Sequence, residues 1–132
     1  MTLLFACTHN AGRSQLAAAI GRALAGARVR IESAGTAPAA AIHPVVAEVL
    51  RERGLPATGT TPRLLTEDLA REVDVLVTMG CGETCPVVPG VRVIDWPLED
   101  PKGLPIERVR AIADDIERRV RALLTELGVP VA

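Results

Sequence analysis

A chain of 132 residues that is 48% hydrophobic can bury one core, and we expect a single domain spanning residues 1–132. Sixteen acidic residues nearly balance 15 basic ones, so the charge favours neither a nucleic-acid partner nor a membrane surface. No apolar stretch approaches the roughly 18 residues of a membrane span, and the N-terminal apolar segment has no basic flank. We therefore expect a cytoplasmic protein.

Strands and helices alternate along the sequence. Apolar runs predict strands, periodic segments predict helices, and Gly or Pro separates them. The expected strands are residues 2–6, 27–33, 73–79 and 91–95, and the expected helices are residues 14–25, 43–53, 66–73 and 105–127. Strands separated by helices pair in parallel. The predicted fold class is α/β: a three-layer sandwich in which helices flank a four-stranded parallel sheet.

The residues with the most reactive side chains follow the ends of predicted strands. Cys7 ends the first strand, Gly80 and Cys81 follow the third, and the segment 95–100 follows the fourth. In sheets of this kind ligands bind beyond the carboxyl ends of the strands. Three separate loops are therefore expected to converge on one site.

The first of these loops reads CTHNAGRS and leads into a helix. Its backbone N–H groups can form a nest for a tetrahedral oxyanion, with Gly12 expected at positive φ, and the helix start adds positive potential that favours an anion or a thiolate. We expect the Arg13 guanidinium to bind two oxygens of the anion and the Ser14 hydroxyl to donate to the Cys7 sulfur. Asn10 is expected to hold the loop in shape through hydrogen bonds between its side chain and the backbone. The predicted oxyanion-binding residues are Thr8, His9, Asn10, Ala11, Gly12, Arg13 and Ser14.

Several of these residues could instead have an ordinary structural role. An isolated cysteine at a strand end is usually a buried structural residue, but the glycine, arginine and serine beside Cys7 favour a reactive thiol. His9 is expected to face solvent, with an auxiliary role open to it. His43 precedes a proline at a helix start and is expected to be structural.

The segment Cys7 to Ser14 resembles the signature of the low-molecular-weight protein tyrosine phosphatase superfamily, which includes phosphatases and thioredoxin-coupled arsenate reductases. SAGT at 33–36, VTMGC at 77–81 and Asp-Pro at 100–101 extend the resemblance over nearly the whole chain. It implies the same four-stranded parallel fold, and it implies that Asp100 is the general acid. Asp95 and Glu99 are competitors on the same loop.

Two features favour reduction of arsenate over hydrolysis of phosphotyrosine. The chain has no tyrosine, and its aromatic residues are one Phe and one Trp, whereas tyrosines follow the Asp-Pro loop in the phosphatases. Cys81 and Cys85 have no use in phosphoryl transfer. The resemblance implies that Cys7 attacks arsenate, that a Cys7–Cys81 disulfide forms as arsenite leaves, and that Cys85 converts it to a Cys81–Cys85 disulfide. Thioredoxin or another thiol reductant would restore the enzyme.

Other interpretations of the thiols remain open. A structural zinc site needs four ligands and the chain adds only two histidines, so we predict no metal site, and we expect no cofactor. Some relatives bind potassium, but the matching positions here are Ala18 and Arg63, which predict no potassium site. The alternatives are a phosphomonoesterase of the same fold and a non-catalytic oxyanion-binding or redox-sensing module. Phosphate or sulfate should mimic arsenate in the loop.

Overall fold

A computed structural model describes residues 1–55, 61–80 and 88–131. Its sheet has four parallel strands in the order β2-β1-β3-β4: β1 (Thr2–Cys7), β2 (Arg30–Gly35), β3 (Val75–Thr78) and β4 (Arg92–Asp95). The helices are α1 (Arg13–Ala25), α2 (Pro44–Glu52), α3 (Glu67–Arg71) and α4 (Ile106–Glu126). The predicted fold class is confirmed.

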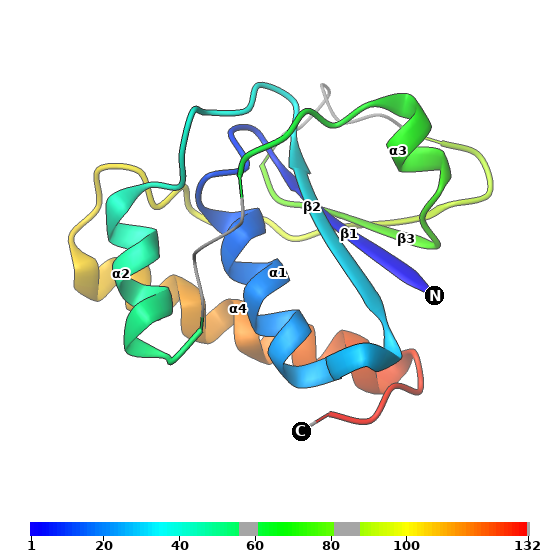
Figure 1. Ribbon diagram of the computed structural model, residues 1–132. Helices are drawn as coiled ribbons and strands as arrows, with labels where there is room; N and C mark the ends of the chain where they lie inside the picture. The colour runs from blue at the N-terminus through cyan, green and yellow to red at the C-terminus, as the bar shows by residue number, and fades with distance from the viewer. Residues whose placement is uncertain (56–60, 81–87, 132) are drawn as a thin grey trace.

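Helices lie on both faces of the sheet (Figure 1), and the buried hydrophobic residues form two clusters of unequal size. Successive side chains of β1 point to opposite faces, as strand geometry requires. Leu3, Phe5 and Cys7 join the larger cluster, which α1, α2 and α4 cover, while Leu4 and Ala6 join the smaller cluster beneath α3. All four residues of β3 are buried, as expected for a strand covered on both faces.

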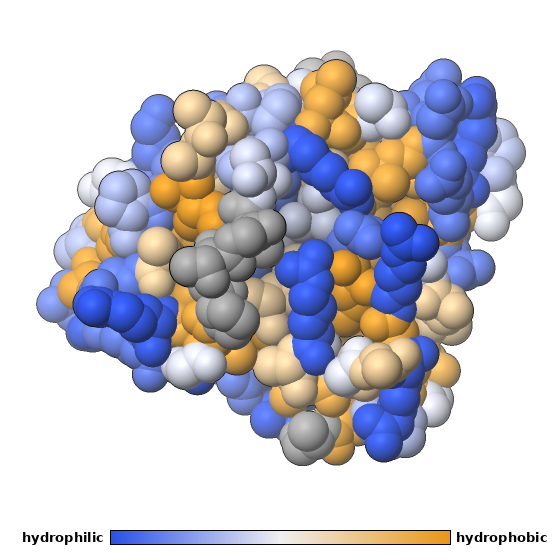
Figure 2. All heavy atoms as spheres, in the orientation of Figure 1, coloured by the Kyte–Doolittle hydropathy of each residue, from blue (hydrophilic) through white to orange (hydrophobic). Residues whose placement is uncertain are grey.

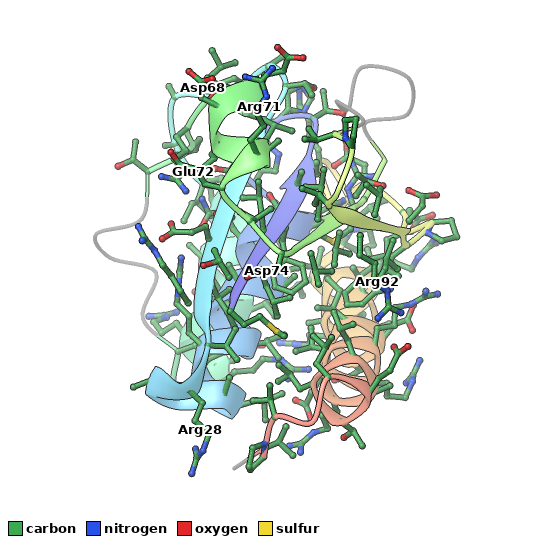
Figure 3. The ribbon with its side chains drawn as sticks, turned by 90° about the vertical axis from the view of Figure 1, so that its right-hand side faces the viewer. Arg28, Asp68, Arg71, Glu72, Asp74 and Arg92 are labelled. Carbon is green, nitrogen blue, oxygen red and sulfur yellow. The ribbon has the colours of Figure 1, made fainter. Side chains whose placement is uncertain are left out.

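Helix α4 supplies much of the larger layer. Its buried residues recur at the three- and four-residue spacing of one helical face, so the opposite face can carry charged side chains. The buried set is Val109, Ile112, Ala113, Ile116, Val120, Leu123 and Leu124. At the edge of the sheet Arg92 of β4, labelled in Figure 3, donates to Glu126 at the end of α4 over 2.7 Å. This ion pair ties the helix to the edge strand.

The element boundaries differ most from the sequence prediction at β2. The strand was expected from residue 27, but residues Gly26–Arg28 form a 3₁₀ turn and β2 begins at Arg30. Gly26 has φ +61°, a conformation that ends α1, and the 3₁₀ turn follows before β2 begins. The short helix α3 begins as predicted, because the Thr66 hydroxyl accepts a hydrogen bond from the Leu69 amide at 3.1 Å.

The outer surface mixes polar and apolar groups. Figure 2 shows strongly hydrophilic and hydrophobic side chains interleaved over one face of the molecule. On α3, Arg71 lies beside Asp68, an ion pair of 3.2 Å that can be followed in Figure 3. Within the described residues, every helix is too short or too polar to cross a membrane.

Candidate active site

The carboxyl ends of the strands bring three loops together. The loop after β1 holds Cys7 to Gly12, and the Thr8 hydroxyl donates to the carbonyl of Gly80, beyond the end of β3, at 3.3 Å. Asp100, beyond β4, lies 3.9 Å from the Arg13 guanidinium through its Oδ2. The structure thus brings Cys7, Arg13 and Asp100 to one edge of the sheet. Cys81 and Cys85 lie outside the described residues.

The backbone of the first loop is turned so that its carbonyls face away from the space that the loop encloses. The carbonyl oxygens of all six residues from Cys7 to Gly12 accept hydrogen bonds. In that order, the donors are the amides of Thr36, Ala37 and Ala39, the side chain of Gln15, and the amides of His43 and Leu16. No described acceptor takes the N–H groups of residues 9–12. This is the arrangement of an anion nest, and we call residues 7–14 the anion loop.

The position of the unusual backbone conformation was predicted wrongly. Gly12 was expected at positive φ, but its φ is −134°, and the positive φ of 50° belongs to Asn10. Asparagine tolerates this region, and three hydrogen bonds hold the residue in it. Gly12 is needed for space instead, because a Cβ there would lie 2.7 Å from Pro101 Cγ. The contact packs the Asp-Pro segment directly on the anion loop.

A chain of side-chain hydrogen bonds leads to the Cys7 sulfur. Asn10 Oδ1 accepts from the Arg63 amide at 3.0 Å, so its Nδ2 must face Ser14 Oγ, which lies 2.7 Å away. Because Ser14 accepts there, its own hydrogen is free to point at Cys7 Sγ, 2.9 Å away. Ser14 and Asn10 are fully buried, and Cys7 is 2% exposed. The expected Ser14–Cys7 contact is therefore present.

Arg13 is buried at the start of α1, and its buried Nε lacks a partner within the described part of the chain. Its Nη1 donates to the Leu98 carbonyl at 3.0 Å, and its side chain is only 8% exposed. A buried guanidinium donor without an acceptor is costly, and the oxygen of a bound anion would satisfy it.

The three candidate acids near this loop have different partners. Asp95 accepts a 2.7 Å hydrogen bond from the Thr78 hydroxyl, which holds it at the strand end, and Glu99 is paired with Arg108 at 2.6 Å. Asp100 accepts the Lys102 amide through Oδ1, which orients its carboxyl group and leaves Oδ2 nearest to Arg13. Of the three, Asp100 is the one whose carboxylate lies beside Arg13 of the anion loop.

Two histidines lie near the same loop. The rings of His9 and His43 are 6.4 Å apart between centroids, and both residues are half-buried. Partial burial lowers the pKa of His43 below its usual value, Asp100 opposes this effect, and the nearby His9 and Lys102 lower the pKa further. The His43 imidazole is therefore part of the electrostatic surroundings of Asp100.

The positions expected to exclude potassium carry no suitable ligands. Ala18 is buried and offers no side-chain oxygen. Arg63 donates through Nε to the Ser33 carbonyl at 3.0 Å and through Nη2 to Glu32 at 2.8 Å. A guanidinium therefore already holds the carbonyl and carboxylate oxygens that a cation would need there, and these residues do not fit a potassium ion. Among the described ranges there is also no cluster of three metal-binding side chains.

Sequence reasoning missed the residues that shape the loop from outside. Gln15 lies in the helix expected at residues 14–25, where no role was assigned to it, yet it is 3% exposed and its side-chain amide donates to the Asn10 carbonyl at 3.0 Å. Gly35 permits the close approach of β2, since a Cβ there would lie 2.6 Å from the Thr8 carbonyl oxygen. The sequence marked Gly35 only as part of the SAGT motif. The motif does not indicate why a glycine is needed at that position.

Comparison with known proteins gives a consistent picture. The family model described as low molecular weight phosphotyrosine protein phosphatase matches residues 2–131. A protein of Halobacterium salinarum that carries the provisional name arsenate reductase is 40% identical over 129 residues, 94% of this chain and 91% of its own length.

Solved structures with similar folds include two arsenate reductases. The thioredoxin-dependent arsenate reductase Cg_ArsC1' of Corynebacterium glutamicum has a TM-score of 0.84 and 41% identity. The match covers 96% of this chain and 61% of that one, so this chain spans less than two thirds of that protein. An arsenate reductase in the phosphate binding state has a TM-score of 0.84 and 27% identity, with 95% of this chain and 97% of that chain covered.

Proposed function

This chain belongs to the low molecular weight phosphotyrosine protein phosphatase family, and from that premise we propose that it is an arsenate reductase. Relatives that match it over most of its length carry that activity in their names, including one 40% identical and one 41% identical. Both the sequence pattern and these relatives favour reduction over phosphate ester hydrolysis. The proposal assigns Cys7 as nucleophile, Arg13 and the loop amides as oxyanion ligands, and Asp100 as general acid.

One observation carries the proposal: the Cys7 thiol lies at the start of a loop in which the carbonyls of residues 7–12 all accept hydrogen bonds from outside the space that the loop encloses. The free amides and the unpartnered Arg13 Nε then have one natural ligand, a small tetrahedral oxyanion. Arsenate and phosphate share that shape and charge. A structure of a relative named for its phosphate binding state supports the choice of ligand class.

In the first step the Cys7 thiolate attacks arsenic. A sulfur–arsenic bond forms, the bond from arsenic to one hydroxyl breaks, and Asp100 gives its proton to that departing hydroxyl, which leaves as water. Ser14 stabilises the thiolate before attack through the hydrogen bond to Sγ. The helix start and Arg13 balance the negative charge on the remaining oxygens.

The later steps require two further thiols, Cys81 and Cys85. Cys81 as a thiolate attacks Cys7 Sγ, so that a sulfur–sulfur bond forms and the sulfur–arsenic electron pair stays on arsenic, which leaves as arsenite. Cys85 then attacks Cys81, which frees the Cys7 thiolate and leaves a Cys81–Cys85 disulfide. An external dithiol, thioredoxin or another thiol reductant, reduces that disulfide. Three residues separate the two cysteines, so the disulfide closes a short loop.

Replacing Cys85 with serine tests the relay. We expect the Cys85→Ser variant to release arsenite once per enzyme and then stop as a Cys7–Cys81 disulfide, detectable by peptide mapping, while the wild type turns over with thioredoxin, thioredoxin reductase and NADPH. Sustained wild-type turnover by the variant would refute the three-thiol relay. Hydrolysis of an aryl phosphate that survives removal of both Cys81 and Cys85, together with no arsenite formed by the wild type, would instead favour the phosphomonoesterase.

A further inference from the structure

The guanidinium of Arg13 lies against the backbone of Gly80. A Cβ placed on Gly80 would be 2.2 Å from Arg13 Nη1, 2.8 Å from Cζ and 3.1 Å from Nη2. These separations lie well inside van der Waals contact, so no other amino acid fits at position 80 without displacing the guanidinium. Gly80 follows β3, far from Arg13 in sequence, and the contact forms only in the folded protein.

The opposite loop limits where the guanidinium can move. Nη1 donates to the Leu98 carbonyl at 3.0 Å, and Nη2 lies 3.9 Å from Asp100 Oδ2. Gly80 is itself fixed to the anion loop, because its carbonyl accepts the Thr8 hydroxyl at 3.3 Å. Arg13 is thus enclosed between Gly80, after β3, and the segment 98–100, after β4. Pushing the guanidinium away from Gly80 would move it against that segment.

We propose that Gly80 is a positioning residue for Arg13: its missing side chain leaves the space that holds the guanidinium where it can bind the oxyanion. The inference rests on the proposed role of Arg13 in oxyanion binding. A methyl group at position 80 would have to push Nη1 by about an ångström to reach ordinary contact, and a shift of that size is large for a bidentate hydrogen-bonding group.

The chain contains a matched control for the backbone. Gly80 has φ +88° and Gly90 has φ +87°, so alanine must adopt nearly the same positive φ at either position. A Cβ on Gly90, however, meets no described atom within 4 Å. The Gly80→Ala and Gly90→Ala variants therefore differ mainly in the contact with Arg13.

The experiment measures the dissociation constant of inorganic phosphate by calorimetry for the full chain and both variants. We expect Gly80→Ala to weaken phosphate binding at least about tenfold, the effect of losing one charged hydrogen bond, while Gly90→Ala binds like the wild type. KM for arsenate should rise in parallel with less change in kcat. Equal weakening in the two variants, or wild-type binding by Gly80→Ala, would overturn the inference.

A double-mutant cycle on thermal stability covers the case in which Gly80→Ala folds poorly. With Arg13→Ala as background, the methyl at position 80 has no guanidinium to displace, so we expect Gly80→Ala to lower Tm less than it does in the wild type. An equal loss of Tm in both backgrounds would contradict the assigned contact. Phosphate binding needs no electron transfer, so these results stand apart from the Cys85→Ser test. A chain that binds phosphate through Arg13 and fails to reduce arsenate would refute only the proposed function.

Discussion

Removal of the Ser14 hydroxyl tests how the reactive thiolate is stabilised. Ser14→Ala deletes the group that joins Asn10 Nδ2, at 2.7 Å, to Cys7 Sγ, at 2.9 Å. A hydrogen bond to a charged group contributes about 1.5–3 kcal/mol, equivalent to roughly 10- to 150-fold in the stability of the anion that accepts it. The thiolate that remains is intrinsically more nucleophilic, which offsets part of the loss. We therefore expect alkylation of Cys7 at neutral pH to slow by about tenfold, near the low end of that range.

The assay uses iodoacetamide on a chain in which Cys81 and Cys85 are serine, so that Cys7 is the single remaining thiol. Ser33→Ala is the matched control, because Ser33 is also buried but is not part of the hydrogen-bond chain from Asn10 through Ser14 to Cys7. Thermal unfolding checks that both variants are folded, since Ser14→Ala also leaves the buried Asn10 Nδ2 without a partner. A folded Ser14→Ala variant alkylated as fast as Ser33→Ala would refute the stabilising role of the hydroxyl.

Three further predictions follow from other contacts. Burial keeps the pKa of His43 below its usual 6.5, so as the pH falls the unfolded chain binds the proton before the folded chain does. Stability therefore falls as the pH drops through 6.5. His43→Gln should make Tm decrease less over that fall in pH. Asp100→Asn should slow single-turnover arsenite release by about 10²- to 10⁴-fold, whereas Glu99→Gln, which breaks only a surface pair, should leave the rate close to wild type. Thr66→Ala should lower the free energy of unfolding in urea by about 1 kcal/mol through the lost cap on Leu69, and an unchanged midpoint would contradict it.

The fold and the location of the site could be predicted because both depend on local signals. Periodicity separates the buried strands from the amphipathic α4, and the carboxyl ends of parallel strands share one edge. Cys7, Arg13 and Asp100 each follow such a strand, so their convergence required no knowledge of distant contacts. The strand order is set by long-range packing and could not be read from spacing alone.

The details that the sequence could not supply come from non-local contacts. Gln15 acts on the Asn10 carbonyl, and Gly80 acts on Arg13 from the end of another strand. The residue type alone, a glutamine or a glycine, does not indicate such a partner. The misplaced positive φ has the same origin: glycine is the obvious choice from sequence, but three hydrogen bonds favour Asn10, and a contact with Pro101 explains Gly12.

The hydrogen bonds on the carbonyls of the anion loop have a consequence for protein engineering. Four of the six donors are backbone amides between Thr36 and His43, in the connection from β2 to α2, where the chemistry has no assigned residue. Grafting residues 7–14 onto another strand–helix junction would transfer the thiol and the arginine without the partner segment that turns the peptide groups. A transplanted site would need both segments, and the connection between β2 and α2 should tolerate sequence changes far better than insertions or deletions.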